Sequence, residues 1–441
     1  MERQISVREF DILIGNSDYA DNPYYTVIPE KQFEELQLFV TEYSSDEEES
    51  DIHEFLKVGH KKGVGYTISL NNYVGLIELP SGFQIEVLPK IEFTTDDEED
   101  RTRSVFLRML RSLKEFEGKA FSSASLKSDK MNLYEIFINM YIQETNILIK
   151  HGLKSTYVAN EDNLNFYKGK LQISRHIRMN LAHKEKFYVQ YDEYSMNRAE
   201  NKLVKATLLK LLSESKNEEN KKNIRRLLPA FELVDESLNY DYDFSKVSID
   251  RNSKDYTRLM DWSKIFLYNK SFTTFAGESI GRALLFPMEK VFEAYVAKWV
   301  KRVFGEAGYY VTAQDSGYYL FDEPHRKFRL RPDIVVRKNG TTIIMDTKWK
   351  RLNKNPNQNY GISQADMYQM YAYAKKYSEE MIDEESVPEV WLLYPYYDEV
   401  KDFEIDPFIS DDGVKVHVYF VNVDKIEESV EQLRSLVGEY I

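Results

Sequence analysis

Apolar and polar positions follow two different periods along this chain, and each change of period marks an expected change between strand and helix. Short apolar runs bounded by Gly, Pro and Asn dominate residues 1–95, which are therefore predicted to be mostly β. The expected elements are an extended start at residues 5–14, an amphipathic segment at 32–43, and strands at 64–68, 73–79 and 83–91. This part holds no catalytic set of residues and is interpreted as a partner-binding domain.

Helical periodicity dominates residues 96–270. The expected elements are a charged linker at 96–103, helices at 104–116, 131–151, 201–212, 221–228 and 252–268, and an exposed charged loop at 213–223. One segment, residues 165–191, instead interleaves basic and apolar side chains and is predicted to be extended; its basic residues include Lys168, Lys170, Arg175, His176 and Arg178. Such a segment can bind a phosphate backbone or form the exposed face of a hairpin, and the sequence pattern does not decide between these two interpretations.

Residues 271–441 combine both periods. The expected helices lie at 287–300, 363–377 and 423–441, and the expected strands at 334–336, 343–345, 390–394 and 413–421. This alternation predicts an α/β core with a mixed sheet. The chain is thus predicted to be an α+β multidomain protein, with a β-rich domain at 1–95, a mainly helical middle region at 96–270 and an α/β domain at 271–441.

Composition narrows the classes of site and surface. The 441 residues suffice for two or three domains, and the absence of cysteine excludes disulfides and thiolate zinc sites. The seven histidines show no ligand spacing, so a metal would be held by oxygen. No apolar run approaches the roughly 20 residues of a membrane span, and a cytoplasmic protein without membrane contact is expected. The net charge of −14 argues against a generally basic surface, although acidic residues cluster at 46–49 and 96–100.

A hairpin around Asn339-Gly340 carries the candidate chemistry. This dipeptide favours a two-residue turn, because both central positions must accept a positive φ. Counting back from that turn places Asp333 directly opposite Asp346. Lys348 follows two residues later and is expected on the same face of the strand, because strand side chains alternate.

Two carboxylates that face each other across strands have Cβ atoms roughly 4.5–5.5 Å apart. They repel unless one takes up a proton or a cation lies between them. Mg²⁺ is commonly held by one or two carboxylates with substrate phosphate and water, and the lysine can orient or deprotonate the attacking water. The alternative is a surface hairpin with solvated charges. The apolar runs 334–336 and 343–345 argue against it, because they are typical of a buried sheet.

This arrangement resembles the PD-(D/E)xK nucleases, with Pro332-Asp333 followed by Asp346-Thr347-Lys348. On the helix expected at 363–377, Gln369 and Tyr373 share a face, which resembles the RecB-like branch and implies that Gln369 supports the site. The resemblance also implies a further acid from the helix before the sheet. Glu289 and Glu293 lie one turn apart there, and geometry alone does not choose between them; solvated glutamates on an ordinary amphipathic helix are the alternative.

The chain also resembles the McrC family, the nuclease subunits of modification-dependent (5-methylcytosine) restriction systems in anti-phage defence. The resemblance rests on residues 63–91, on the segment from 167–170 to Asn197 with the helix after it, and on residues 286–293. It implies that the glutamate after Phe292 joins the site, so Glu293 is preferred and Glu289 is the alternate. The implied metal ligands are Asp333, Asp346 and Glu293, with Mg²⁺ as the metal and Mn²⁺ as a substitute.

The same resemblance implies two partners: an McrB-like AAA+ GTPase ring, stimulated by an inserted N-terminal domain, and double-stranded DNA carrying a modified base. The sequence has no GxxxxGK[ST] loop, so no nucleotide is expected to bind this chain. Two rival interpretations are a stand-alone PD-(D/E)xK nuclease that cleaves without nucleotide, and an inactive scaffold that activates a AAA+ ring. The intact set of Asp333, Asp346 and Lys348 argues against the scaffold.

Overall fold

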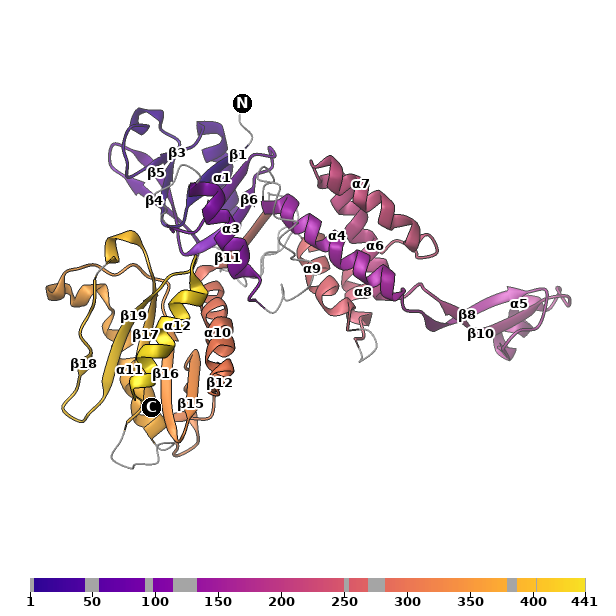
Figure 1. Cartoon of the computed structure of the whole chain (residues 1–441). Coiled ribbons are helices and arrows are strands. Elements are labelled where there is room, and N and C mark those ends of the chain that lie inside the picture. The colour runs from indigo at the N-terminus through magenta and orange to yellow at the C-terminus, as the bar shows by residue number, and fades with distance from the viewer. Residues whose placement is uncertain are drawn as a thin grey trace. The chain divides into compact units, whose positions relative to one another are not determined.

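The structure, a computed structural model, describes residues 4–43, 55–91, 98–113, 133–249, 254–268, 282–378, 387–401 and 403–440. The chain forms two compact units (Figure 1): unit 1 comprises Met1–Glu117 and Glu278–Ile441, and unit 2 comprises Gly118–Gly277. The first and last parts of the sequence therefore fold together. The mixture of helices with several sheets confirms the α+β class. Among the described residues, no helix combines the length and apolar character needed to cross a membrane.

The N-terminal part of unit 1 contains two four-stranded sheets. The first has the order β1 (Gln4–Arg8), β7 (Gln84–Leu88), β6 (Tyr73–Glu78) and β11 (Arg282–Pro287). The second has the order β3 (Thr26–Val27), β2 (Ile12–Ile14), β5 (Gly65–Leu70) and β4 (Leu56–Lys61), beside helix α1 (Glu30–Tyr43). The strands expected between residues 64 and 91 are thus confirmed. The acidic cluster at 46–49 lies outside the described residues.

Strand β11 comes from the far side of the sequence and pairs antiparallel with β6. Gly75 has φ +141°, and a Cβ at this position would lie 2.0 Å from the carbonyl oxygen of Leu284. Only glycine therefore allows the two strands this close approach. β11 leads directly into α10 (Met288–Glu306), which packs against the six-stranded sheet described next. One continuous stretch of chain therefore joins the two sheets.

The C-terminal part of unit 1 is built on a six-stranded mixed sheet. Its order is β12 (Tyr310–Ala313), β15 (Ile334–Lys338), β16 (Thr341–Thr347), β17 (Glu389–Pro395), β19 (Lys415–Val421) and β18 (Phe408–Ile409). β16, β17 and β19 run parallel, and the other pairs are antiparallel. A separate two-stranded sheet joins β13 (Tyr319–Phe321) and β14 (Lys327–Arg329). The central strands are buried and apolar, as expected of a sheet covered on both faces.

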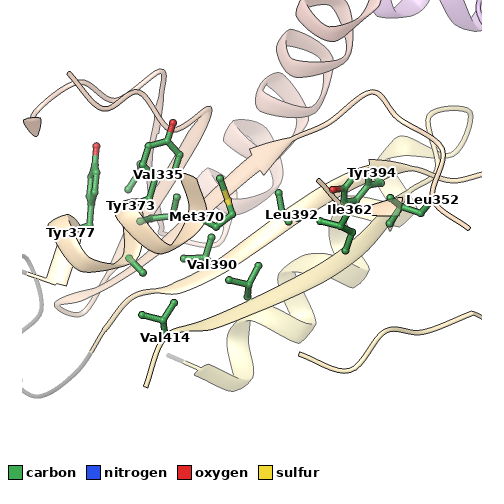
Figure 2. Packing of buried hydrophobic residues seen from close by; sticks show 13 residues of the cluster. Val335, Leu352, Ile362, Met370, Tyr373, Tyr377, Val390, Leu392, Tyr394 and Val414 are labelled. Carbon is green, nitrogen blue, oxygen red and sulfur yellow. The ribbon is translucent and has the colours of Figure 1, made fainter. Parts of the chain in front are cut away.

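Helices cover the two faces of this sheet. On one face, α11 (Gln364–Tyr377) inserts Met370 and Tyr373 into a buried cluster with Val335 and Val390 (Figure 2). Side-chain alternation turns the neighbouring strand residues, such as Met345, toward the opposite face. There α10 packs against β12, β16 and α12 (Ile426–Val437). Asp333, two positions before Val335, and Asp346, two positions after Ile344, therefore share the face that α11 covers.

Helix α3 (Glu98–Leu110) begins earlier than predicted, so the expected linker at 96–103 is wrong from residue 98 onward. Its first turn carries Glu98, Glu99 and Asp100. Acidic side chains at this end stabilise a helix through its dipole, which explains why a charged run is helical here. Arg101 and Arg108 both bind Asp424, just before α12, and so tie α3 to the C-terminal part.

Unit 2 consists of a helical bundle and a small sheet. Its helices are α4 (Leu133–His151), α5 (Ile173–Asn180), α6 (Ala199–Glu214), α7 (Glu218–Leu227), α8 (Tyr240–Lys246) and α9 (Tyr256–Tyr268). Its sheet has the order β8 (Thr156–Leu164), β10 (Phe187–Ser195) and β9 (Lys170–Leu171). The loop expected at 213–223 is wrong, because only a short turn separates α6 from α7. Buried Glu135 fixes this turn by accepting hydrogen bonds from the backbone N–H groups of Lys216 and Asn217.

The basic segment at 165–191 is not extended throughout, because α5 occupies its centre. Ile173 and Ile177 lie four residues apart, which is the helical spacing that the basic residues obscured. Two of the basic side chains find partners within the segment's own sheet. Lys168 Nζ lies 3.9 Å above the Tyr191 ring, and Arg175 forms an ion pair with Glu161.

Candidate active site

The hairpin between β15 and β16 has the predicted register. Asn339 and Gly340 adopt φ values of 52° and 79°, as a two-residue turn of this kind requires. Five residue pairs follow, from Lys338 opposite Thr341 to Ile334 opposite Met345. The register of the hairpin is as predicted up to Ile334, and Asp333 and Asp346 are the next residues beyond this last pair.

The two aspartates differ in their hydrogen bonds. Asp333 Oδ2 accepts from the Thr347 backbone N–H at 2.7 Å and from its hydroxyl at 2.6 Å. Asp346 is only 1% exposed, and its Oδ2 lies 2.5 Å from Lys348 Nζ. Strand β16 ends at Thr347, so Lys348 lies just beyond the strand rather than within it. Its backbone N–H still donates to the Leu393 carbonyl at 2.9 Å, which keeps this residue beside β17.

Helix α11 supplies the partners of the lysine. Ser363 caps the helix by accepting from the Asp366 N–H. Lys348 Nζ donates to Gln369 Oε1 at 3.2 Å, and Gln369 Nε2 donates to the Tyr373 hydroxyl at 2.8 Å. The expected contact of Gln369 with the candidate site is therefore present, and the amide group holds the amine on one side and the phenol on the other.

The two candidate glutamates of α10 have different surroundings. Glu293 is partly buried, and its Oε1 accepts from Gln314 Nε2 at 2.8 Å. Gln314 also donates its backbone N–H to the Asp333 carbonyl at 2.8 Å, so it links the helix to the strand that carries the aspartate. Glu289 is exposed. The structure thus places Glu293, rather than Glu289, beside Asp333.

Burial and mutual repulsion disturb the acids. Burial, and then the charge of Asp333, raise the pKa of Asp346 to about 7. The same two causes raise the pKa of Glu293 to about 7, and burial raises the pKa of Asp333 as well. For Lys348, burial lowers the pKa, but the charge and hydrogen bond of Asp346, together with the charges of Asp333 and Asp366, outweigh burial and keep the pKa above its ordinary value. At Asp346 and Glu293, burial and the charge of Asp333 therefore outweigh the nearby lysines, Lys348 and Lys290.

The acids do not form a complete metal cage. Within the part of the chain that the structure describes, no three His, Asp or Glu side chains lie close enough together to hold a metal ion among themselves. The structure brings Asp333, Asp346, Lys348 and Gln369 into one site, and places Glu293 near them without joining the three carboxylates in one cluster. A cation held by Asp333 and Asp346 would therefore need further ligands besides these two carboxylates.

Sequence reasoning missed two contacts of this site. Thr347 stands between Asp346 and Lys348, yet its hydroxyl and N–H both bind Asp333. Gln314 has φ 48°, a conformation unusual for a residue other than glycine. Thr347 could have been inferred from its place in the motif. Gln314 leaves no signal in the sequence, because its role depends on the fold.

The chain is similar to known proteins of one restriction system. A family model described as "McrBC 5-methylcytosine restriction system component" matches residues 68–395, more than half of the chain. A half-complex from a tetradecameric assembly of Thermococcus gammatolerans McrB AAA+ hexamers with bound McrC is similar in fold, with a TM-score of 0.68 and 18% identity over 98% of this chain and 100% of that chain. The cryo-EM structure of the Thermococcus gammatolerans McrBC complex gives a TM-score of 0.45 and 20% identity over 68% of this chain and 88% of that chain. The search of curated proteins found no match.

Proposed function

Because this chain belongs to the family of McrBC 5-methylcytosine restriction system components, we propose that it is the DNA-cleaving subunit of a modification-dependent restriction complex. The observation that carries the proposal is the site at the end of β15 and β16. There Asp333 Oδ2 accepts from the backbone N–H and the hydroxyl of Thr347, the residue after Asp346, and Lys348 Nζ lies 2.5 Å from the Asp346 carboxylate. Two acids and a lysine on a hairpin of a buried mixed sheet are the arrangement expected of a PD-(D/E)xK nuclease domain.

Asp333 and Asp346 are the residues that would hold Mg²⁺. They fit a divalent cation. Burial and the charge of Asp333 raise the pKa of Asp346 to about 7, and a cation between the two carboxylates would relieve their repulsion. Mg²⁺ usually takes one or two carboxylates and completes its shell with water and substrate phosphate, so a full cage of protein ligands is not required. When bound, the metal would polarise the phosphate and supply an activated water. Glu293 would hold a water molecule in the outer coordination shell of the metal.

Lys348 would position the attacking water and stabilise negative charge that develops on the phosphate. Its amine is constrained on two sides, by Asp346 at 2.5 Å and by Gln369 Oε1 at 3.2 Å. Gln369 in turn rests on the Tyr373 hydroxyl. These contacts select one orientation of a long, flexible side chain before the substrate arrives, which is the preorganisation that catalysis by positioning needs.

The proposed partner is a AAA+ GTPase ring of the McrB kind. Support comes from the similarity in fold to McrC bound to McrB AAA+ hexamers, which extends over 98% of this chain. The sequence contains no GxxxxGK[ST] loop, so the nucleotide would bind the partner. The proposed substrate is double-stranded DNA carrying a modified base, which the complex would cleave after the ring has hydrolysed nucleotide.

The test compares wild type, Asp346→Ala and Asp412→Ala, the last being an exposed aspartate of the same unit. First, calorimetry would measure Mn²⁺ binding in the presence of a short duplex with a non-hydrolysable phosphate linkage. Second, the complex with its AAA+ ring would be assayed for cleavage of 5-methylcytosine-containing DNA and for GTP hydrolysis. We expect Asp346→Ala to lose metal binding and cleavage while GTP hydrolysis remains stimulated, and Asp412→Ala to match wild type.

Equal metal binding and equal cleavage by wild type and Asp346→Ala would overturn the catalytic assignment and favour a scaffold that only activates the ring. Cleavage by this chain alone, with metal but without partner or nucleotide, would favour a stand-alone nuclease instead. Loss of GTPase stimulation in Asp346→Ala would contradict the proposed separation between the cleavage site and the partner-binding surface.

A further inference from the structure

A buried glutamate from the N-terminal part reaches the residue beside the candidate catalytic lysine. Glu9 directly follows β1 and is 0% exposed. The indole Nε1–H of Trp349 donates to both of its carboxylate oxygens, at 2.9 and 3.0 Å. The backbone N–H of Lys90, just after β7, donates to Glu9 Oε1 at 2.8 Å. One carboxylate therefore joins the ends of two N-terminal strands to the segment that follows β16.

Trp349 links two of the elements that carry the candidate active site. It is the residue directly after Lys348, and it is 6% exposed. Its ring packs against Phe292 with the ring centroids 5.2 Å apart, and Phe292 directly precedes Glu293 on α10. The orientation of one indole thus affects where the backbone places the lysine, and where the helix places the glutamate.

Packing alone does not hold this segment. A cavity of about 310 Å³ lies beside it, lined by residues that include Glu9, Phe10, Trp349, Lys350 and Arg351. A cavity of this size can hold water, so the side chains on its border lack protein packing partners on that side. The segment's polar contacts therefore matter more than usual. Besides the bonds to Glu9, Arg351 Nη2 donates to the Lys90 carbonyl at 2.9 Å, again reaching the end of β7.

Glu86 shows that Glu9 is not simply one of several equivalent buried acids. Glu86 is equally buried and lies in β7 of the same sheet. Its contacts are an ion pair with Arg103 at 2.7 Å and hydrogen bonds from Gln4 and Ser6, all within the N-terminal part. Glu9 instead accepts hydrogen bonds from Trp349, in the segment that carries Lys348. Burial raises the pKa of Glu9 to about 7, so above that pH its carboxylate accepts these hydrogen bonds as an ion, and such bonds are about twice as strong as neutral ones.

We propose that Glu9 is a positioning residue for Lys348, acting through the hydrogen bonds that it accepts from Trp349. The proposal deepens the nuclease function proposed above and depends on it. In this arrangement the geometry of the cleavage site is set from the N-terminal sheet, so a displacement of the ends of β1 and β7 reaches the lysine without any change in the metal ligands.

The test uses the complete complex with its AAA+ ring and measures single-turnover cleavage at saturating DNA and Mg²⁺. Trp349→Phe removes the donor and keeps a ring against Phe292. Glu9→Gln keeps one acceptor oxygen, and Glu86→Gln is the matched control for loss of a buried charge. We expect Trp349→Phe to slow cleavage roughly 10- to 100-fold, as a small misplacement of a reacting group does. Glu9→Gln should retain an intermediate rate, and Glu86→Gln should keep the wild-type rate even where its melting temperature falls.

The double variant Glu9→Gln/Trp349→Phe distinguishes positioning from general destabilisation. If the two residues act through one contact, it is no slower than Trp349→Phe alone, because effects at a shared interaction do not add. The DNA concentration for half-maximal rate should stay unchanged in every variant. Wild-type rates in both single variants would overturn the proposal, and so would a Glu86→Gln rate reduced as much as that of Glu9→Gln.

Failure of the nuclease function itself has a different outcome: wild type would not cleave at all. In that case hydrogen exchange decides whether Glu9 positions the segment. The Lys348 N–H bonds to the Leu393 carbonyl and the Lys350 N–H to the Lys348 carbonyl. Faster exchange of these two amides in Glu9→Gln, but not in Glu86→Gln, would support the positioning role, and equal exchange in both would refute it.

Discussion

Replacing Asp346 by asparagine is expected to stabilise the metal-free protein above neutral pH while abolishing cleavage. Asp346 is 1% exposed, and burial together with the charge of Asp333 raises its pKa from 3.8 to about 7. In the absence of a cation, an ionised Asp346 therefore destabilises the fold. The asparagine of the variant keeps the shape of the side chain, but it cannot carry the charge that repels Asp333.

The size of the effect follows from the shift of the pKa. A change from 3.8 to about 7 corresponds to roughly 4 kcal/mol at 1.36 kcal/mol per unit, and this is an upper limit because the variant also loses the ion pair with Lys348. The unfolded chain gives up this proton near its ordinary pKa, whereas the folded protein keeps it until about pH 7. Unfolding thus releases a proton between these values, and the free energy of unfolding falls as pH rises through them.

Urea unfolding at pH 5 and pH 8, followed by tryptophan fluorescence in the absence of metal, would measure this difference. Trp299, Trp349 and Trp391 lie in unit 1, so the signal reports mainly on the unit that carries the site. Asp346→Asn should lose less stability between the two pH values than wild type and should exceed it at pH 8. Added Mg²⁺ should then stabilise wild type but not the variant, because the carboxylate pair would be incomplete.

Asp366→Asn is the control with the opposite sign. Burial raises the pKa of Asp366, but its hydrogen bonds with Ser363 and Lys350 and the nearby lysine charges outweigh this and keep the pKa below its ordinary value. Its loss should therefore destabilise the protein at pH 8. The reasoning would be refuted if Asp346→Asn were less stable than wild type at pH 8, or if both proteins showed the same dependence on pH.

Two further substitutions separate the residues around the pair. Glu293→Gln should reduce cleavage and raise the Mg²⁺ concentration that half-maximal cleavage requires, because Glu293 lies beside Asp333. Glu289 is exposed, so Glu289→Gln should have neither effect. Equal Mg²⁺ titrations for the two variants would contradict the choice of Glu293. Gln369→Leu should slow single-turnover cleavage roughly 10- to 100-fold, as loss of a supporting contact does, while Gln364→Leu, on the same helix but bonded to Tyr368, should keep the wild-type rate. A wild-type rate in Gln369→Leu would show that Lys348 needs no support from α11.

The site's local geometry was predictable because short-range rules determine it. A two-residue turn fixes the register of the strands that it joins, so Asn339-Gly340 was enough to predict the pairs up to Ile334, with Asp333 and Asp346 as the next residues. Helical spacing likewise placed Gln369 next to Tyr373, and their hydrogen bond is present. In both cases the contact lies within one hairpin or one turn of helix, where the sequence contains the whole signal.

Other contacts that sequence reasoning missed join distant parts of the chain. Trp349 finds Glu9 some 340 positions away, and β11 pairs with β6 across the whole of unit 2. No local period encodes such pairings, because they depend on how finished elements pack. The errors within elements have another cause. Charged residues at the start of α3 and in α5 obscure the helical spacing, which Ile173 and Ile177 indicate in α5.

The pairing of β6 with β11 also has a consequence for synthesis on the ribosome. β6 ends at Glu78, but its partner begins at Arg282, about 200 residues later, a delay of roughly 10 to 40 s at usual elongation rates. Through that interval the nascent chain exposes an open strand edge, the kind of surface on which chaperones act and misfolding begins. Because β11 runs straight into α10, the strand that closes this edge is followed at once by the helix that carries Glu293. A chain terminated early therefore has neither a closed sheet nor the means to build the cleavage site.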